Sequence, residues 1–337
     1  MMIRGVIIMN VFVLGTGAWG IALSILLENN GNNVTMWSAF ENEISEITRT
    51  RENSRVLPGV KIPDRIKLTT DISEVKTYDA VLLSVPSFAI KNVCEQIKPY
   101  ISEDMLIINA GKGLEPSSGK RFSQIISETL GVDGIVAISG PTHAEEVSKK
   151  VPTSIVAASN IPEKAAKAQD LLMSDYMRVY INDDTVGVEL GGALKNIIAL
   201  CAGICDGIGM GDNTKAALIT RGLHEISKLG IAMGGKAETF MGLAGIGDLV
   251  VTCCSVHSRN HKAGVLIGKG TSASDAIKEV GTVEGFYALE TTYSLAKRLN
   301  VEMPIVNACH DIFANGLAPE DAVKMLMNRP KKSEALQ

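Results

Sequence analysis

Short runs of β-branched and other apolar residues alternate with helix-like stretches up to about residue 182. The runs that predict strands are "NVFVL", "NVTMW", "IKLTT", "AVLLSV", "MLIINA", "IVAIS", "TSIVAA" and "MRVYI". Turn residues such as Pro58-Gly59 and Gly140-Pro141 separate several of them. This alternation is typical of a parallel β-sheet with helices on both faces. We therefore expect an α/β parallel-sheet domain at residues 1–183.

After Asp184 the apolar residues recur every three to four positions, and runs of β-branched residues nearly disappear. This spacing predicts helices, so residues 184–337 are expected to form an all-α domain. Asn182, Asp183 and Asp184 mark the boundary, because Asp and Asn favour the start of a helix. The chain of 337 residues is also longer than the range in which single hydrophobic cores keep growing, which favours two domains.

Charge and hydropathy argue against two classes of partner. The net charge is −4 and no long run of Lys or Arg occurs, so we expect neither nucleic acid nor an anionic membrane as a partner. The most apolar segment, residues 186–208, contains Glu189, Lys195 and Asp206, which makes it a poor membrane span. We interpret the residues before Met9 as a short extension ahead of the first strand rather than a secretory signal.

Cysteine and histidine spacing gives no sign of a disulfide framework or a metal site. The six cysteines have no regular spacing, and Cys253 and Cys254 are adjacent, which predicts free thiols in a reducing cytoplasm. His257 and His261 are four residues apart, but no second pair of ligands accompanies them. We therefore expect no metal.

Three glycines spaced G-x-G-x-x-G follow the first predicted strand directly, in "VFVLGTGAWG". Gly15 permits the tight turn, Gly17 lets the backbone approach a pyrophosphate, and Gly20 allows close packing of helix on strand. The helix start that follows presents amides and a favourable dipole to phosphates. Because strand, glycines and helix occur in this order, the motif predicts a dinucleotide site, with an ordinary glycine turn as the alternative.

Ligands of open parallel sheets bind beyond the carboxyl ends of the strands. Three segments end predicted strands: "SVPS", "GKG" and "SGPTHAEE". In the last, Thr142 and Glu145 have the spacing of a capping box, which would start another helix at the same cleft. Lys112, in "GKG", is expected to contact a ligand, and a solvated loop lysine is the alternative.

The helical half carries "GGALKN" at residues 191–196. Two glycines inside a helix cost about 1 kcal/mol each relative to alanine, so we expect a ligand or the other domain to approach there closely. Lys195 lies on this apolar helix, where burial would lower its pKa and allow it to donate a proton. A snorkelling lysine at a domain interface is the alternative. Asp248 also has apolar neighbours and needs a cationic partner, for which Lys195 is a candidate.

Ser258, Arg259 and Asn260 place a guanidinium beside two small polar side chains at a predicted helix start. Such a group suits a phosphate or a carboxylate. A capped and solvated helix end fits the same pattern equally well.

From about Asn10 to Leu326 the chain resembles the bacterial-type NAD(P)-dependent glycerol-3-phosphate dehydrogenases. The matching motifs, in order, are "GTGAWG", "VPS", "GKGLE", "SGPT", "VELGGALKNIIA", "DGIGMGDNTKAALITRGL", "FMGLAGIGDLVVTC", "SRN", "VEGFYA" and "MPI". The resemblance implies a Rossmann domain followed by a helical domain like that of 6-phosphogluconate dehydrogenase, with the active site between them. It implies reversible reduction of dihydroxyacetone phosphate to sn-glycerol 3-phosphate for phospholipid synthesis. A homodimer is expected from the family and from the prevalence of two-fold dimers.

The resemblance also implies roles for individual residues. Lys195 would be the proton donor or acceptor, with Lys112, Asp248 and Asn196 around the reacting oxygen. The substrate would further be lined by Gly140, Thr142, Ser258, Arg259 and Asn260. The cofactor would be approached by Gly15, Gly17, Ala18, Trp19, Gly20, Lys112, Ala144, Arg259, Val283 and Glu284. His143 and Gly111 depart from the residues that the family more often has.

The end of the second predicted strand bears on the choice of dinucleotide. A site strict for NAD usually has Asp or Glu there to bind the ribose 2′-hydroxyl, whereas this chain has Ser38, Ala39 and Phe40. No arginine stands there either, and Arg49 and Arg51 are expected to face solvent from the next helix. We therefore expect Ser38 to contact the cofactor, and both NAD and NADP to be used with a modest lean to NADP.

Two other functions remain open at this point. The first is another two-domain dehydrogenase that acts on a β-hydroxy acid with the same lysine. The second is a non-catalytic protein that senses NAD(P), against which the presence of Lys112, Lys195, Asp248 and Arg259 argues.

Overall fold

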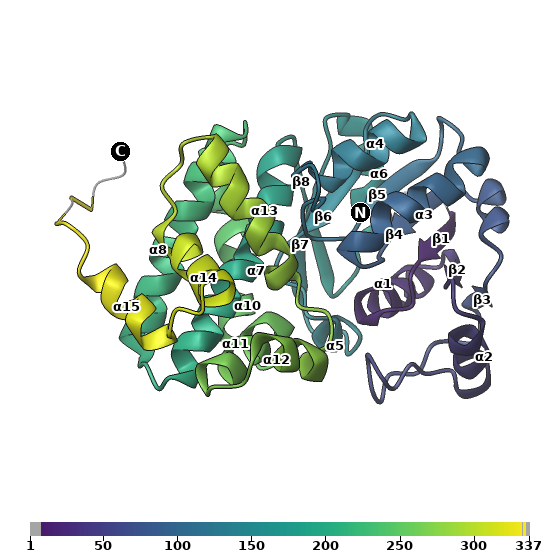
Figure 1. The fold of residues 1–337 in the computed structure, drawn as a ribbon. Helices are drawn as coiled ribbons and strands as arrows, with labels where there is room; N and C mark the ends of the chain where they lie inside the picture. Colours follow the sequence, from purple (N-terminus) through teal and green to yellow (C-terminus); the bar gives the residue numbers. More distant parts are fainter. Residues whose placement is uncertain (1–7, 332, 335–337) are drawn as a thin grey trace.

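A sheet of eight strands forms the N-terminal half of the computed structural model, which describes residues 8–331, 333 and 334 (Figure 1). Most of the predicted N-terminal extension therefore lies outside the described residues. The strand order is β3-β2-β1-β4-β5-β6-β7-β8. All eight predicted runs form strands: β1 Asn10–Leu14, β2 Asn33–Trp37, β3 Lys67–Thr69, β4 Ala80–Leu83, β5 Leu106–Asn109, β6 Val136–Ser139, β7 Thr153–Ala158 and β8 Met177–Asn182.

Strands β1 to β6 are parallel, but β7 pairs with β6 in the antiparallel direction. Strand β8 is in turn parallel to β7. The expected parallel direction is therefore wrong for these two strands. The connection between β6 and β7 contains only the four-residue helix α5 (Ala144–Val147), which is too short to return the chain to the opposite end of the sheet.

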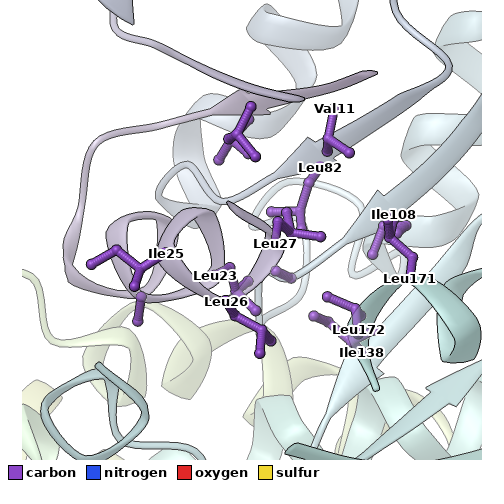
Figure 2. Packing of buried hydrophobic residues seen from close by; sticks show 14 of the residues in the cluster. Val11, Leu23, Ile25, Leu26, Leu27, Leu82, Ile108, Ile138, Leu171 and Leu172 are labelled. Atoms are coloured by element: carbon purple, nitrogen blue, oxygen red, sulfur yellow. The ribbon is translucent and has the colours of Figure 1, made fainter. Parts of the chain in front are cut away.

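Successive strand residues point to opposite faces of the sheet. Since the residues on both faces are apolar, helices cover both faces. Val11 and Val13 belong to one hydrophobic cluster with α1 and α6, while Phe12 and Leu14 belong to another with α3 and α4. Figure 2 shows leucines of α1 and α6 gathered near Val11 and neighbouring strand residues. The helices of this half are α1 Ala18–Asn29, α2 Glu41–Thr50, η1 Ile72–Thr77, η2 Ser87–Ala89, α3 Ile90–Ile97, η3 Lys98–Tyr100, α4 Phe122–Leu130, α5 and α6 Pro162–Leu172.

Helix α7 (Thr185–Gly207) is the centre of the second half, which is helical as predicted. Asp184 caps it by accepting a hydrogen bond from the Gly187 amide at 2.8 Å, as expected for the boundary. The other helices of this half are α8 Asp212–Ala232, α9 Ala237–Phe240, the π-helical turn η4 Leu243–Gly247, α10 Asp248–Cys254, α11 Arg259–Gly268, α12 Ala273–Val280, α13 Glu284–Arg298, α14 Pro304–Ala314 and α15 Pro319–Met327.

Two helical segments, 185–207 and 237–254, are long and apolar enough to cross a membrane by length and composition alone. The apolar window of α7 is entirely buried inside the protein, whereas less than half of the second window is buried. Close packing buries α7: a Cβ atom added to Gly264 of α11 would collide with the Leu200 carbonyl oxygen of α7. Glu189, Lys195 and Asn196 of α7 therefore lie in the protein interior.

Candidate active site between the sheet and helix α7

One carboxylate joins two lysines where the sheet meets α7. Lys112 follows β5, Lys195 lies on α7, and Asp248 begins α10. The Lys112 ammonium donates to Asp248 Oδ2 at 2.7 Å, and the Lys195 ammonium donates to Asp248 Oδ1 at 2.5 Å. The predicted pairing of Lys195 with Asp248 is therefore confirmed. Three segments that are far apart in the sequence thus place their charged groups at one point.

Burial sets the electrostatics of this cluster. Burial and the nearby charge of Lys112 lower the pKa of Lys195, Asp248 opposes both effects, and the resulting pKa is about 8. Burial alone would raise the pKa of Asp248, but the charges of Lys112 and Lys195 outweigh it and hold that pKa below its usual value. Asp248 is thus a stable anion beside a lysine that exchanges its proton close to neutral pH.

The two glycines of α7 allow the close approach that the sequence predicts. A Cβ atom on Gly191 would lie 2.5 Å from the Ala244 carbonyl oxygen, and one on Gly192 would lie 2.6 Å from Ser139 Oγ. Any side chain at Gly191 would therefore displace backbone, and one at Gly192 would displace the Ser139 side chain. The absence of side chains therefore lets the end of β6 and the turn before α10 lie against α7 next to Lys195.

Thr252 is a member of the cluster that the sequence analysis did not identify. Its hydroxyl accepts a hydrogen bond from Lys195 Nζ at 2.7 Å and donates to the Asp248 carbonyl oxygen at 2.6 Å. The signal was present in the sequence, because Thr252 is four residues after Asp248 and side chains at this spacing share a helix face.

The segment after β6 binds Lys112 and does not form the predicted helix cap. Lys112 Nζ donates to the Gly140 carbonyl oxygen at 2.9 Å and to Thr142 Oγ1 at 3.1 Å. The expected capping box of Thr142 and Glu145 is wrong: α5 begins at Ala144, with no side-chain cap. The Thr142 hydroxyl is instead engaged by the ammonium and by the Gly140 carbonyl.

His143 lies beside this cluster. Burial lowers its pKa, and the charge of Lys195 adds to that effect. Its Nε2 atom is buried without a hydrogen-bond partner among the described residues. Ala144 is buried against α1, the helix that follows the glycine motif.

Asn196 and Asn260 are buried and bind each other. Asn260 Nδ2 donates to Asn196 Oδ1 at 3.0 Å, and Asn260 Oδ1 accepts from the Gly285 amide at 2.8 Å. Gly285 lies in the first turn of α13, directly after Val283 and Glu284. The asparagine pair therefore connects α7 and α11 to the start of α13.

The predicted helix start at Arg259 is confirmed, with Ser258 as its cap: Ser258 Oγ accepts from the His261 amide at 3.2 Å. Arg259 is exposed in the first turn of α11, and its guanidinium makes no hydrogen bond within the described part of the chain. Glu284 is partly buried, which raises the pKa of its carboxyl, and Oε1 accepts from the Ser87 amide after β4 at 3.4 Å. Glu284 thus joins α13 to the end of the sheet.

The glycine motif has the geometry expected of a phosphate cradle. Gly15 has φ +120°, and a Cβ atom there would lie 2.6 Å from the Ser84 carbonyl oxygen. A Cβ atom on Gly17 would meet no atom within 4 Å, whereas one on Gly20 would collide with the Gly15 carbonyl. Trp19 Nε1 is buried without a partner among the described residues. The open space at Gly17 and the unpaired indole N–H therefore fit a dinucleotide at the start of α1.

The end of β2 differs from the sequence expectation in two respects. Ser38 is buried, and its hydroxyl donates to the Glu43 carboxylate at 2.6 Å, so a carboxylate does lie at this strand end. Arg49 is exposed as expected. Arg51 does not face solvent as expected, because its guanidinium donates to the carbonyl oxygens of Pro63 and Ile66. Arg51 thus holds the loop after α2 and is not free for a ligand.

Within residues 8–331, 333 and 334, no three His, Cys, Asp or Glu side chains gather as metal ligands. His261 Nε2 lies 2.8 Å from Asp206 Oδ2, and His257 Nδ1 lies 3.9 Å from Glu145 Oε1. The two histidines thus face different carboxylates. All six cysteines are free thiols.

Comparison with known proteins identifies similar chains over nearly the whole length. The family model for the N-terminus of NAD-dependent glycerol-3-phosphate dehydrogenase matches residues 10–165, and the model for its C-terminus matches residues 184–324. A glycerol-3-phosphate dehydrogenase (NAD(P)+) of Clostridium perfringens is 49% identical over 325 residues, covering 96% of this chain and 98% of the relative. The crystal structure of glycerol-3-phosphate dehydrogenase from Coxiella burnetii, 37% identical, matches with a TM-score of 0.92 over 96% of this chain and 99% of that one.

Proposed function

The chain belongs to the NAD-dependent glycerol-3-phosphate dehydrogenase family, and on that premise we propose that it interconverts dihydroxyacetone phosphate and sn-glycerol 3-phosphate with NAD(P)H. The reaction supplies glycerol 3-phosphate for phospholipid synthesis. The observation that carries this proposal is the Lys112–Asp248–Lys195 cluster, which lies at the same edge of the parallel strands as the glycine motif. Residues 1–183 form the cofactor domain in this proposal, and residues 184–337 form the substrate domain.

Lys195 is the proton donor to the substrate oxygen in ketone reduction and the acceptor in the reverse direction. Its pKa of about 8 suits both directions near neutral pH. Lys112 stabilises the negative charge that develops on that oxygen, and Asp248 holds both ammonium groups in place. Asn196 completes this catalytic group by fixing α7 against α11. The nicotinamide of the cofactor supplies the hydride when bound.

The start of α11 is the proposed site of the substrate phosphate. Arg259 offers an exposed guanidinium there, and helix N-termini favour anions. Asn260 and the Ser258 cap hold this turn in place. The remaining substrate contacts are proposed at Gly140 and Thr142.

The cofactor site extends from the glycine motif to α13. The family is NAD(P)-dependent, and we propose contacts at Gly15, Gly17, Ala18, Trp19, Gly20, Ser38, Lys112, Ala144, Arg259, Val283 and Glu284. The expected lean to NADP rested on the absence of a carboxylate at the end of β2. Glu43 removes that premise, because its carboxylate accepts the Ser38 hydrogen bond. We therefore propose that both cofactors bind and that Glu43 sets the preference.

We further propose that the protein works in the cytoplasm as a homodimer, without a membrane span or a nucleic-acid partner. Six free thiols are compatible with a reducing compartment, and the burial of α7 inside the fold accounts for its apolar composition. Sedimentation of the purified chain would measure its oligomeric state directly.

Turnover is tested by following nicotinamide absorbance with dihydroxyacetone phosphate and each reduced cofactor. Oxidation of NADH or NADPH that depends on this ketone is the expected result. Turnover of a β-hydroxy acid in its place would favour the other two-domain dehydrogenases. Cofactor binding without turnover of any such substrate would favour a sensor.

Arg259→Lys keeps the positive charge but loses the planar fork that binds a phosphate through two hydrogen bonds. We expect KM for dihydroxyacetone phosphate to rise by about tenfold, a typical effect of one lost hydrogen bond to a charged group. The control substrate is unphosphorylated dihydroxyacetone, whose slower turnover should change much less. Equal losses for both ketones would show that Arg259 does not bind the phosphate.

The pH dependence of the reaction follows from Lys195. Ketone reduction needs the protonated amine, so kcat/KM should fall about tenfold per pH unit above the Lys195 pKa of about 8. Oxidation of glycerol 3-phosphate needs the neutral amine, so its kcat/KM should instead rise with pH up to about 8 and level off above that value. Rates measured between pH 7 and 10 avoid titration of the substrate phosphate, whose second pKa is about 6. Parallel pH profiles for the two directions would contradict this role.

A further inference from the structure

Glu43, in the first turn of α2, contacts both segments that frame the proposed ribose site. Its Oε2 atom accepts hydrogen bonds from Thr16 Oγ1 at 2.7 Å and from Ser38 Oγ at 2.6 Å. Thr16 lies between Gly15 and Gly17 of the glycine motif, and Ser38 follows β2. The carboxylate therefore bridges the β1–α1 turn and the end of β2.

The neighbours of Glu43 fix its position and leave its charge almost uncompensated. Its Oε1 atom accepts from Asn53 Nδ2 at 3.0 Å, and Asn53 Nδ2 also donates to the Thr16 carbonyl oxygen. The one ion pair of Glu43 within the described part of the chain is with Arg55, at 3.5 Å, and the Arg55 side chain is 80% exposed. Such an exposed arginine compensates little of the negative charge of Glu43.

The orientation of the carboxylate leaves room for one more donor. A carboxylate offers about four acceptor positions, and the two hydroxyls and one amide that bind Glu43 use three of them. In a Rossmann fold, an acidic side chain at this place binds the ribose 2′-hydroxyl. That acidic side chain usually follows the second strand directly, whereas Glu43 reaches the same place from the next helix and acts together with Ser38.

We propose that Glu43 determines cofactor specificity and selects NAD(H) over NADP(H). A 2′-phosphate placed between Thr16 and Ser38 would meet a fixed negative charge, which the exposed Arg55 side chain offsets only weakly. Arg51, which follows α2, offers no further cation because its guanidinium is held by backbone carbonyls of the following loop. A ribose 2′-hydroxyl would instead find a free acceptor. This inference rests on the proposed cofactor site. It reverses the modest preference for NADP that was expected from Ser38 at the end of β2.

Binding of nucleotide fragments tests the proposal without turnover. Calorimetry of the wild-type chain with ADP and with 2′,5′-ADP should show ADP binding at least tenfold more tightly. Glu43→Gln keeps the size and one acceptor oxygen but removes the charge, so it should reduce this preference at least tenfold. The matched control is Glu46→Gln, which removes an exposed carboxylate from the same helix and should leave the preference unchanged. Higher salt should narrow the wild-type difference, because salt screens the repulsion.

The outcomes separate the role of Glu43 from the cofactor site itself. Equal or tighter binding of 2′,5′-ADP to the wild-type chain would overturn the role of Glu43 while leaving the site in place. So would an unchanged preference in a Glu43→Gln variant whose thermal melting matches that of the wild type. Binding of neither fragment would overturn the cofactor site, and the role of Glu43 with it. If Glu43→Gln fails to fold, the affinities of the wild-type chain for ADP and 2′,5′-ADP, and their dependence on salt, still test the role of Glu43.

Discussion

Replacement of Lys195 by Met should reduce kcat by about 10²–10⁴-fold or more, since general acid catalysis usually contributes a factor of this size. Methionine is close to lysine in length but cannot donate a proton, and it suits a site where only 6% of the residue is exposed. Asp248 keeps its ion pair with Lys112 at 2.7 Å, so the carboxylate is not left without a partner. The fold should therefore survive while the proton transfer is lost.

Cofactor affinity separates this loss from a general disturbance of the site. Lys195 makes no contact with the glycine motif, so the dissociation constant of NADH should change by less than about threefold. Lys269→Met, at an exposed position after α11, is the control and should retain wild-type kcat. A Lys195→Met variant that retains more than a tenth of wild-type kcat would remove Lys195 from the catalytic role.

The fold was largely predictable because the central strands, such as β4, β5 and β6, are buried on both faces. Such strands appear in the sequence as continuous apolar runs, and all eight runs were recognised. The direction of β7 was not predictable from its run, since apolar residues do not encode whether a strand runs parallel to its neighbour. Direction depends on the connection, and here the four-residue helix α5 does not carry the chain back across the sheet.

The cluster of Lys112, Lys195 and Asp248 was predictable because each residue is anomalous in its own segment. Lys195 and Asp248 are charged residues with apolar neighbours in the sequence, and Lys112 directly follows a central strand. Glu43 carries no such signal, because "ENEISE" is an ordinary amphipathic helix start with several acidic residues. Only the folded chain shows that Glu43, rather than a neighbouring glutamate, reaches Ser38.

Asp248→Asn should affect both stability and catalysis, because one carboxylate compensates two ammonium groups. Breaking a buried ion pair by removing one partner typically costs about 3–5 kcal/mol, and here Lys112 and Lys195 would repel each other across the site. Asp248 is also the main group that raises the Lys195 pKa against burial. Without it that pKa falls below about 8, so less Lys195 is protonated at neutral pH and ketone reduction slows.

The signature of this prediction is a combined change that a merely structural role would not produce. Urea unfolding should show the loss of stability, and the decline of kcat/KM for ketone reduction should begin at lower pH than in the wild type. Asp206→Asn is the matched control, because Asp206, on α7, also pairs with a lysine, Lys215, and with His261, but its side chain is 23% exposed. It should lower stability by about 1 kcal/mol or less and leave the pH profile unchanged. A destabilised Asp248→Asn variant with the wild-type pH profile would show that Asp248 supports the fold without tuning Lys195.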